Sequence, residues 1–203
     1  MTPPRAKDIA YVRFQVPDLD AAEKWLSDFG LARASRTEDA LCMKGGNGAP
    51  FAWVAHKGEA RFLGLGFDMG DDAMLDALAA KTGVAPATNA ELGGGKIIRL
   101  TDPDGFTIEA VLRPHGAPET LPPRQKLNDA REKARLNTQS APPNGPASVW
   151  RLGHAVVNVT DFRKSEAWYK THFGLITSDE IELAPGATLG AFLRCDQGTR
   201  PVD

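Results

Sequence analysis

Short apolar runs and amphipathic segments alternate through the first 113 residues. Runs rich in β-branched and aromatic residues predict strands over 10–16, 40–44, 51–56, 61–67, 96–100 and 106–112. Helical spacing of apolar residues predicts helices over 19–29 and 71–82, with Asp18 before the first and Gly30 and Gly83 after the two ends. The order strand, helix, strand, strand occurs twice, and each unit has room for one or two further weak strands.

The beginning of this pattern recurs later in the chain. Residues 11–31 align with residues 154–175 at an offset of 143, and the alignment pairs Val16 with Val159 and Trp25 with Trp168. After one inserted residue, Phe-Gly-Leu at 29–31 meets Phe-Gly-Leu at 173–175. Matches in register within one strand, one helix and one glycine stop indicate a structural repeat. We therefore expect the third unit to begin with a strand at 154–159, and aromatic residues 25, 29, 168 and 173 to anchor the repeated helices in the core.

Proline separates the repeated parts. Seven of the fifteen prolines lie between residues 114 and 148. The charged stretch 124–137 in the middle lacks Gly and Pro and predicts one short exposed helix. The expected organisation is a two-unit domain at 1–113, a connector at 114–148 and a third unit at 149–203.

Composition excludes several classes of protein. The 203 residues are 42% hydrophobic and 25% charged, with 24 basic and 26 acidic residues, so the chain is ordinary globular protein with a net charge of −2. Scattered basic residues predict no nucleic-acid or membrane-surface partner, and the absence of a signal peptide or apolar span predicts a cytoplasmic protein. Cys42 and Cys195 have no second Cys or His at metal spacing and predict neither a disulfide framework nor a zinc site.

The repeat resembles the vicinal oxygen chelate superfamily, which includes glyoxalase I, bleomycin-resistance proteins and type I extradiol dioxygenases. The residues that carry the resemblance are DPDGFTIE at 102–109 and, in the third unit, LGH at 152–154, WY at 168–169, FGL at 173–175 and FLRC at 192–195. It implies an α+β fold of repeated βαβββ units, with curved, mainly antiparallel sheets and outer helices. The order of units is most similar to that of extradiol dioxygenases, in which a two-unit domain without metal precedes a metal-binding pair.

The resemblance also implies a metal held by two His and one carboxylate, with open positions for a chelating substrate and dioxygen. In the N-terminal pair the three ligand positions fall on Tyr11, Phe62 and Glu109. Two of these are aromatic, so that pair is expected to hold no metal. Glu109 is then interpreted as the relic of a metal ligand or as a hydrogen-bonding residue.

In the third unit the first ligand position falls on His154. A lone His in a strand is more often a core or surface residue, and the repeat is what marks this one as a candidate ligand. Strand alternation places Val156 and Asn158 on the same side as His154. The resemblance makes Val156 and Phe192 candidate residues lining the substrate pocket. The spacing of the N-terminal positions puts the two other ligands at about residues 205 and 252, beyond Asp203.

The chain is therefore expected to resemble the first two thirds of an extradiol-type enzyme and to be inactive by itself. The longer enzyme would use Fe(II), or alternatively Mn(II), to cleave a catechol-like small aromatic substrate with dioxygen, and would form a homo-oligomer. The alternative is a non-catalytic protein of the same superfamily that binds a small molecule. His56, His115 and His172 are interpreted as solvated surface residues.

Overall fold

The computed structural model describes residues 3–119 and 145–195. The N-terminal part contains strands β1 (Asp8–Val16), β2 (Ala32–Arg36), β3 (Ala40–Lys44), β4 (Trp53–Lys57), β5 (Arg61–Asp68), β6 (Ala87–Thr88), β7 (Lys96–Thr101) and β8 (Thr107–Leu112), with helices α1 (Leu19–Phe29) and α2 (Asp72–Thr82). The C-terminal part contains helix α3 (Phe162–Phe173) and strands β9 (Ile176–Ala184) and β10 (Ala187–Arg194). The connector helix expected at 124–137 lies outside the described residues.

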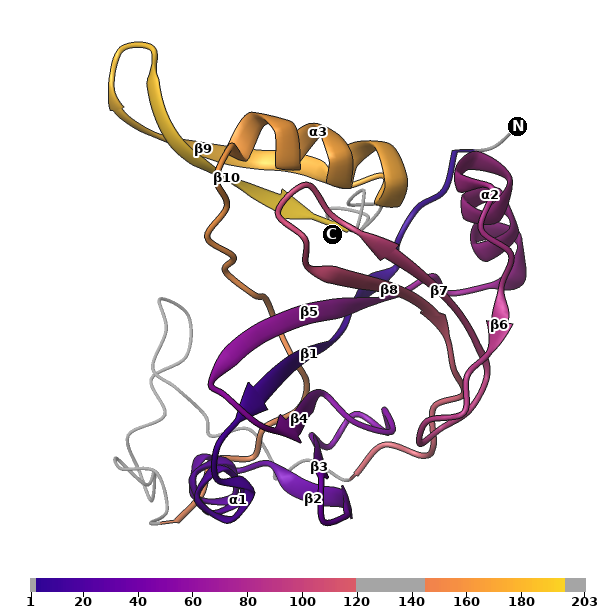
Figure 1. The fold of residues 1–203 in the computed structure, drawn as a ribbon, viewed down its shortest axis with the longest axis vertical. Coiled ribbons are helices and arrows are strands. Elements are labelled where there is room, and N and C mark those ends of the chain that lie inside the picture. The colour runs from indigo at the N-terminus through magenta and orange to yellow at the C-terminus, as the bar shows by residue number, and fades with distance from the viewer. Residues whose placement is uncertain (1–2, 120–144, 196–203) are drawn as a thin grey trace, which may run out of the picture.

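The N-terminal strands form one curved sheet of eight strands in the order β2-β3-β4-β1-β5-β8-β7-β6 (Figure 1). Each half has the same plan: the first strand pairs in parallel with the last strand of its own unit, β1 with β4 and β5 with β8. The two halves join where β1 and β5 run antiparallel, with Val12 opposite Leu65. The α+β fold of two βαβββ units is confirmed.

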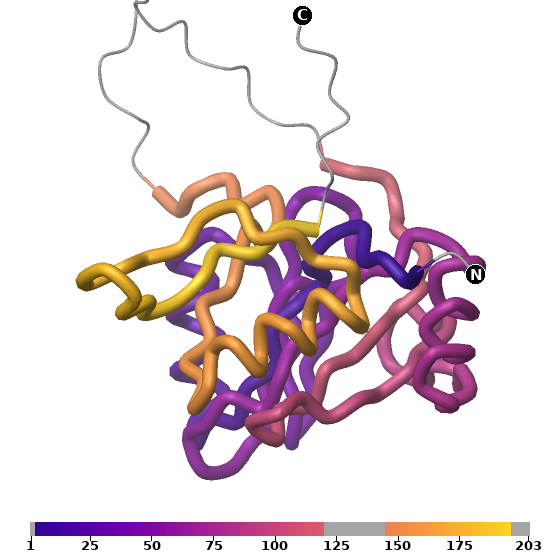
Figure 2. Tube along the Cα trace, turned by 90° about the horizontal axis from the view of Figure 1, so that it is seen from above, coloured from indigo at the N-terminus to yellow at the C-terminus, as the bar shows by residue number. Residues whose placement is uncertain are grey.

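The helices cover the outer face of this sheet, as expected (Figures 1 and 2). Each begins at an Asp that caps the first turn, Asp18 for α1 and Asp71 for α2, and each ends at a glycine in the left-handed conformation, Gly30 or Gly83. Leu75 and Leu78 of α2 are fully buried against the outer side of the sheet, in the cluster that contains Val12. Because side chains alternate along a strand, the neighbours of Val12 point to the inner face.

Helix α3 packs against the N-terminal domain. Phe173 is fully buried with its ring 4.6 Å from that of Phe67, and its carbonyl oxygen accepts a 2.8 Å hydrogen bond from the Ala6 amide. The Tyr169 hydroxyl donates to Asp102 Oδ2 at 2.9 Å, and Ser165 donates to Asp104. The turn between β7 and β8 thus serves as the docking point for the third unit.

Two expectations about local structure are wrong. Trp25 and Phe29 stack on each other at 5.8 Å but are 65% and 56% exposed, because Leu19 and Leu26 occupy the side of α1 that faces the sheet. Residues 154–159 form no strand, since none of the described strands pairs with them. Of the four aromatic anchors expected, Phe173 is fully buried and Trp168 is half-buried.

Candidate functional site

A buried carboxylate lies at the centre of the inner face of the N-terminal sheet. Glu109 on β8 accepts a 2.8 Å hydrogen bond from the Tyr11 hydroxyl and two from Arg13, at 3.1 Å from Nε and 2.8 Å from Nη2. Arg99 on β7 donates to the other carboxylate oxygen at 2.8 Å. The interpretation of Glu109 as a hydrogen-bonding residue is confirmed, and the position that would bind a cation in a metal site is filled by guanidinium groups.

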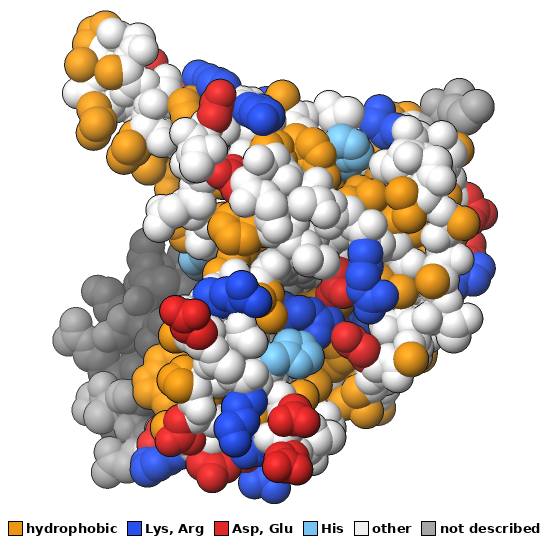
Figure 3. Space-filling model, viewed as in Figure 1, with side chains coloured by type: hydrophobic (Ala, Val, Ile, Leu, Met, Phe, Trp, Pro, Cys, Tyr) orange, Lys and Arg blue, Asp and Glu red, His pale blue; other side chains and the backbone are white. Residues whose placement is uncertain are grey.

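Two further side chains complete the contacts of Arg13. Glu91, from the loop before β7, accepts from Nη2 at 2.8 Å, and Nη1 lies 3.1 Å from His56 Nε2. His56 is half-buried in this contact, not a solvated surface residue as expected. Charged and histidine side chains gather across the middle of the molecule in Figure 3, between the third unit and α1. We call Tyr11, Arg13, His56, Glu91, Arg99 and Glu109 the inner-face cluster.

The electrostatics of the inner-face cluster favour the ionised carboxylate. Burial by itself would raise the pKa of Glu109, but the charge of Arg13 and the hydrogen bonds from Arg13, Tyr11 and Arg99 outweigh it, so the pKa is lowered. Burial raises the pKa of Tyr11, and the negative charge of Glu109 raises it further. Burial, followed by the charge of Arg13, lowers the pKa of His56. At neutral pH the carboxylates of Glu91 and Glu109 pair with the guanidinium groups of Arg13 and Arg99. Neutral Tyr11 donates a hydrogen bond to Glu109.

The structure corrects one of the three N-terminal ligand positions. Tyr11 and Glu109 meet, but both lie opposite Gly66 in the sheet. Phe62 packs elsewhere, with its ring 5.4 Å from Phe14 and 5.0 Å from Phe106. A Cβ atom on Gly66 would come within 2.5 Å of the Tyr11 ring, so that ring fills the space over Gly66. The conclusion that the N-terminal pair lacks the three ligands is unchanged.

Arg113 lies under the inner face and was not foreseen from the sequence. It is 6% exposed, its guanidinium carbon lies 4.9 Å from the Tyr11 ring centre and 4.5 Å from that of Phe51, and Nη2 donates to the carbonyl oxygens of Ala10 and Phe51. Its Nε and Nη1 have no hydrogen-bond partner among the described residues. Burial lowers its pKa. These hydrogen bonds hold the end of β8 against β1 and against Phe51, which lies just before β4.

The candidate residues of the third unit are exposed. Along residues 154–159 exposure alternates: His154, Val156 and Asn158 are exposed, while Ala155 and Val157 pack towards the core. The alternation expected from the sequence is therefore present although the strand is not. On β10, Phe192 is 56% exposed while Leu193 packs inward. Val156 is 85% exposed, so the proposed substrate-lining side chains face solvent.

The described residues do not make a metal site. No group of three or more His, Cys, Asp and Glu side chains among them is placed to hold a metal ion. His154 supplies one imidazole and nothing within the described ranges joins it. No helix in these ranges is long and apolar enough to span a membrane.

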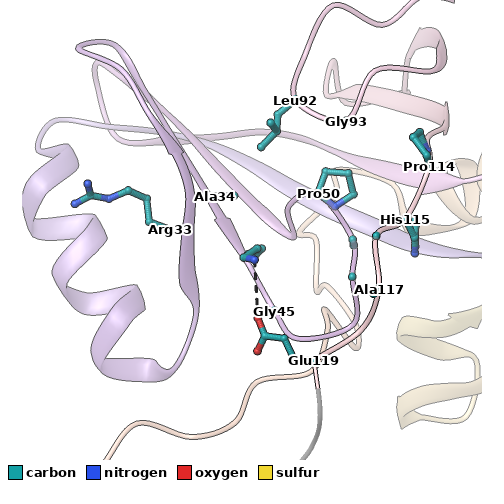
Figure 4. A pocket seen from close by; sticks show the side chains of 14 residues that line it. Arg33, Ala34, Gly45, Pro50, Leu92, Gly93, Pro114, His115, Ala117 and Glu119 are labelled. Atoms are coloured by element: carbon teal, nitrogen blue, oxygen red, sulfur yellow. Dashed lines mark ion pairs between the residues drawn. The ribbon is translucent and has the colours of Figure 1, made fainter.

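A separate cavity of about 570 Å³ opens beside the start of the connector (Figure 4). It is lined by the edge of β2 and β3, by the loops at 45–50 and 92–93, and by residues 114–119. Lys44 Nζ and Glu119 Oε1, which both belong to the lining, lie 3.9 Å apart. None of the residues that the sequence marks as candidates lines this cavity.

Comparison with known proteins identifies the fold. No protein-family model and no curated protein matches the sequence. Among solved structures, a Mn(II)-bound glyoxalase from Novosphingobium aromaticivorans matches with a TM-score of 0.72 and 22% identity, over 95% of this chain and 59% of that one. The homoprotocatechuate 2,3-dioxygenase from Arthrobacter globiformis matches with a TM-score of 0.66 and 22% identity, over 97% and 59%.

A 2,3-dioxygenase from Pseudomonas sp. KL28 matches with a TM-score of 0.72 and 14% identity, over 96% of this chain and 68% of that one. The chain thus spans a little more than half to two thirds of the length of these three structures. Identities this low establish architecture and leave chemistry open. The repeated βαβββ units and these neighbours together show that the chain has the fold of the vicinal oxygen chelate superfamily.

Proposed function

We propose that this chain forms the first three units of a metal-dependent, extradiol-type ring-cleavage dioxygenase that acts on a catechol-like aromatic diol. The observation that carries the proposal is the placement of His154, Val156 and Phe192. All three are exposed on the third unit, on the sides of their segments that face away from the core. Solved structures with this fold include a catechol 2,3-dioxygenase and a homoprotocatechuate 2,3-dioxygenase with bound 3,4-dihydroxyphenylacetate.

In this proposal His154 is one of three ligands, and a fourth unit supplies the other His and the carboxylate. The ion is Fe(II), with Mn(II) as the alternative, and it would hold the diol and dioxygen side by side. Val156 and Phe192 would contact the aromatic ring. The third unit by itself does not fit a metal, so no catalytic step follows from the described residues alone.

The alternative is a non-catalytic protein that binds a small hydrophobic molecule. The inner-face cluster favours this reading for the N-terminal pair, because guanidinium groups neutralise Glu109 and leave no room for a metal. The two readings differ in what they require of His154. A dioxygenase loses its metal without this imidazole, whereas a binding protein does not need it.

The test compares the 203-residue chain with the chain extended along its reading frame, each with and without His154→Ala. We expect the extended protein to hold iron or manganese and to form the coloured ring-fission product of a catechol in air, and His154→Ala to abolish both. His115→Ala is the matched control, because His115 is a partly exposed histidine outside the proposed site. We expect the 203-residue chain to bind either metal no better than a surface histidine does.

Three outcomes contradict the proposal. The first is an extended reading frame without a further His and carboxylate at comparable spacing. The second is an extended protein whose metal content survives His154→Ala. The third is an extended protein that holds metal but cleaves no catechol, which would favour the binding protein.

A further inference from the structure

We propose that the cavity beside the start of the connector binds a small organic carboxylate, at a site separate from His154. The cavity measures about 570 Å³, within the roughly 300–1,000 Å³ that small-molecule pockets span. Its lining comes from the N-terminal domain and from residues 114–119 (Figure 4). The proposal therefore concerns a different surface from the proposed function and does not depend on it.

The apolar part of the lining favours a ligand with a compact hydrocarbon body. Six of the lining side chains are apolar, and they come from β2, from the loops before β4 and β7, and from the segment after β8: Ala34, Ala49, Pro50, Leu92, Pro114 and Ala117. Four more positions of the lining are glycines, which add backbone and no side chain. Leu92 is 42% exposed, and a ligand that covers it would remove apolar surface from water.

One cation of the lining is available to a ligand. Lys44 Nζ lies 3.9 Å from Glu119 Oε1, which is longer than a hydrogen bond. The Lys44 side chain is 40% exposed, so its ammonium group is accessible. Arg33 also belongs to the lining, but its guanidinium group extends towards α1 and pairs with Glu23 (Figure 4). A single accessible ammonium group suits one carboxylate better than a doubly charged phosphate ester.

The other titratable side chains of the lining leave this preference unchanged. Glu119 is 64% exposed, so water screens its charge, and its loose pair with Lys44 contributes little. The Nε2 atom of His115 lies 3.6 Å from Asp68 Oδ2. One carboxylate and one imidazole do not make a metal site, and no group of three metal-ligating side chains occurs in the described ranges.

A buried positive charge lies next to the cavity wall. Arg113 directly precedes Pro114 of the lining, and its guanidinium carbon lies 4.5 Å from the ring centre of Phe51, next to position 50 of the lining. Arg113 is 6% exposed and donates to carbonyl oxygens, and its Nε and Nη1 have no partner among the described residues. Asp68, whose charge also acts on Arg113, contacts His115 instead. The charge of Arg113 is therefore not matched by a hydrogen-bonded carboxylate, and it adds to the attraction for an anion in the cavity.

The experiment titrates the isotope-labelled 203-residue chain with benzoate at pH 7 and follows the backbone amide signals by two-dimensional NMR. We expect saturable shifts concentrated at residues 33–34, 44–50, 92–93 and 114–119. Benzamide has nearly the same shape without the charge. It should bind about tenfold more weakly, because it cannot form the charge-assisted hydrogen bond to Lys44.

Two substitutions test the parts of the site. Lys44→Met keeps most of the side chain and removes its charge, so it should raise the Kd for benzoate about tenfold. Leu92→Asp places a carboxylate in the apolar wall and should abolish the saturable shifts. Lys24→Met is the matched control, because Lys24 is 77% exposed on α1 and pairs with Asp28 outside the cavity, so benzoate should bind this variant unchanged. The dispersion of the amide signals verifies that each variant is folded.

Several results overturn the proposal. The first is a chain whose amide signals show no saturable shift with benzoate. Shifts concentrated outside the lining would refute the location, and equal affinities for benzamide and benzoate would refute the ligand class. A folded Lys44→Met variant that binds benzoate as the unchanged chain does would remove Lys44 from the site.

Discussion

Replacing Glu109 with Gln tests whether the inner-face cluster stabilises the N-terminal domain. The Glu109 side chain is 4% exposed and that of Arg13 is 9% exposed, so the substitution removes one charge of a buried ion pair without changing its shape. Breaking such a pair costs about 3–5 kcal/mol, because the remaining charge stays buried. Arg13 retains Glu91 and the contact with His56, which places the expected loss at the lower end, about 3 kcal/mol.

The assay is urea unfolding at pH 7 followed by circular dichroism. A loss of this size should also lower the melting temperature by about 6–12 °C for a protein of this length. Glu91→Gln is the control: the Glu91 side chain is 34% exposed and accepts a hydrogen bond from Nη2 of Arg13, so loss of its charge should cost about 1 kcal/mol or less. A cost below that of the control for Glu109→Gln would refute the reasoning.

The pH dependence follows from the lowered pKa of Glu109. A carboxyl group with a lower pKa in the folded state stabilises the protein fully above its unfolded pKa, near about 4.3. That contribution is lost as the pH falls from there through the lower pKa of the folded state. The difference in stability between the unchanged chain and Glu109→Gln should therefore be constant from pH 7 to pH 5 and shrink below it. A difference that does not change with acidification would show that the charge of Glu109 contributes nothing.

Three further substitutions test packing. Tyr169→Phe should cost about 1.5–3 kcal/mol in urea unfolding, because it removes a buried hydrogen bond to the Asp102 carboxylate; a neutral result would show that this bond does not hold α3. Phe173→Ala should cost about 3–5 kcal/mol, and faster amide hydrogen exchange should appear first in α3; uniform exchange would argue against local undocking. Gly66→Ala should cost about 1–3 kcal/mol by crowding the Tyr11 ring, and unchanged thermal melting would contradict that contact.

The pattern of hydrophobic residues in the sequence predicts most of the helices and strands of the N-terminal domain. Helices α1 and α2 begin at or within one residue of the expected positions, because a capping Asp and a left-handed Gly mark their ends in the sequence. Strand β2 escaped detection because its residues, ARASR, contain no apolar run. Strand β6 is two residues long and has no period to detect.

The inner-face cluster could not have been predicted from spacing. Arg13 reaches Glu91 and Glu109, which lie 78 and 96 residues further along the chain, and only the closed sheet brings them together. One signal was available: Arg13 sits two residues after Tyr11 and therefore shares its face, which made a buried Arg beside Glu109 foreseeable. Likewise, the exposed Trp25 and Phe29 show that helical spacing alone does not reveal which of two apolar stripes faces the sheet.

The N-terminal pair and the third unit differ in the surroundings of their candidate ligand positions. In the N-terminal pair the carboxylate at the ligand position is matched by guanidinium groups of the same domain, so this pair is electrostatically complete without a metal. In the third unit His154, which corresponds to Tyr11, is exposed on a segment whose pairing partner is not among the described strands. Under the proposed function, strand pairing at this edge would come before metal binding, because the ligands of a metal site must first be brought together.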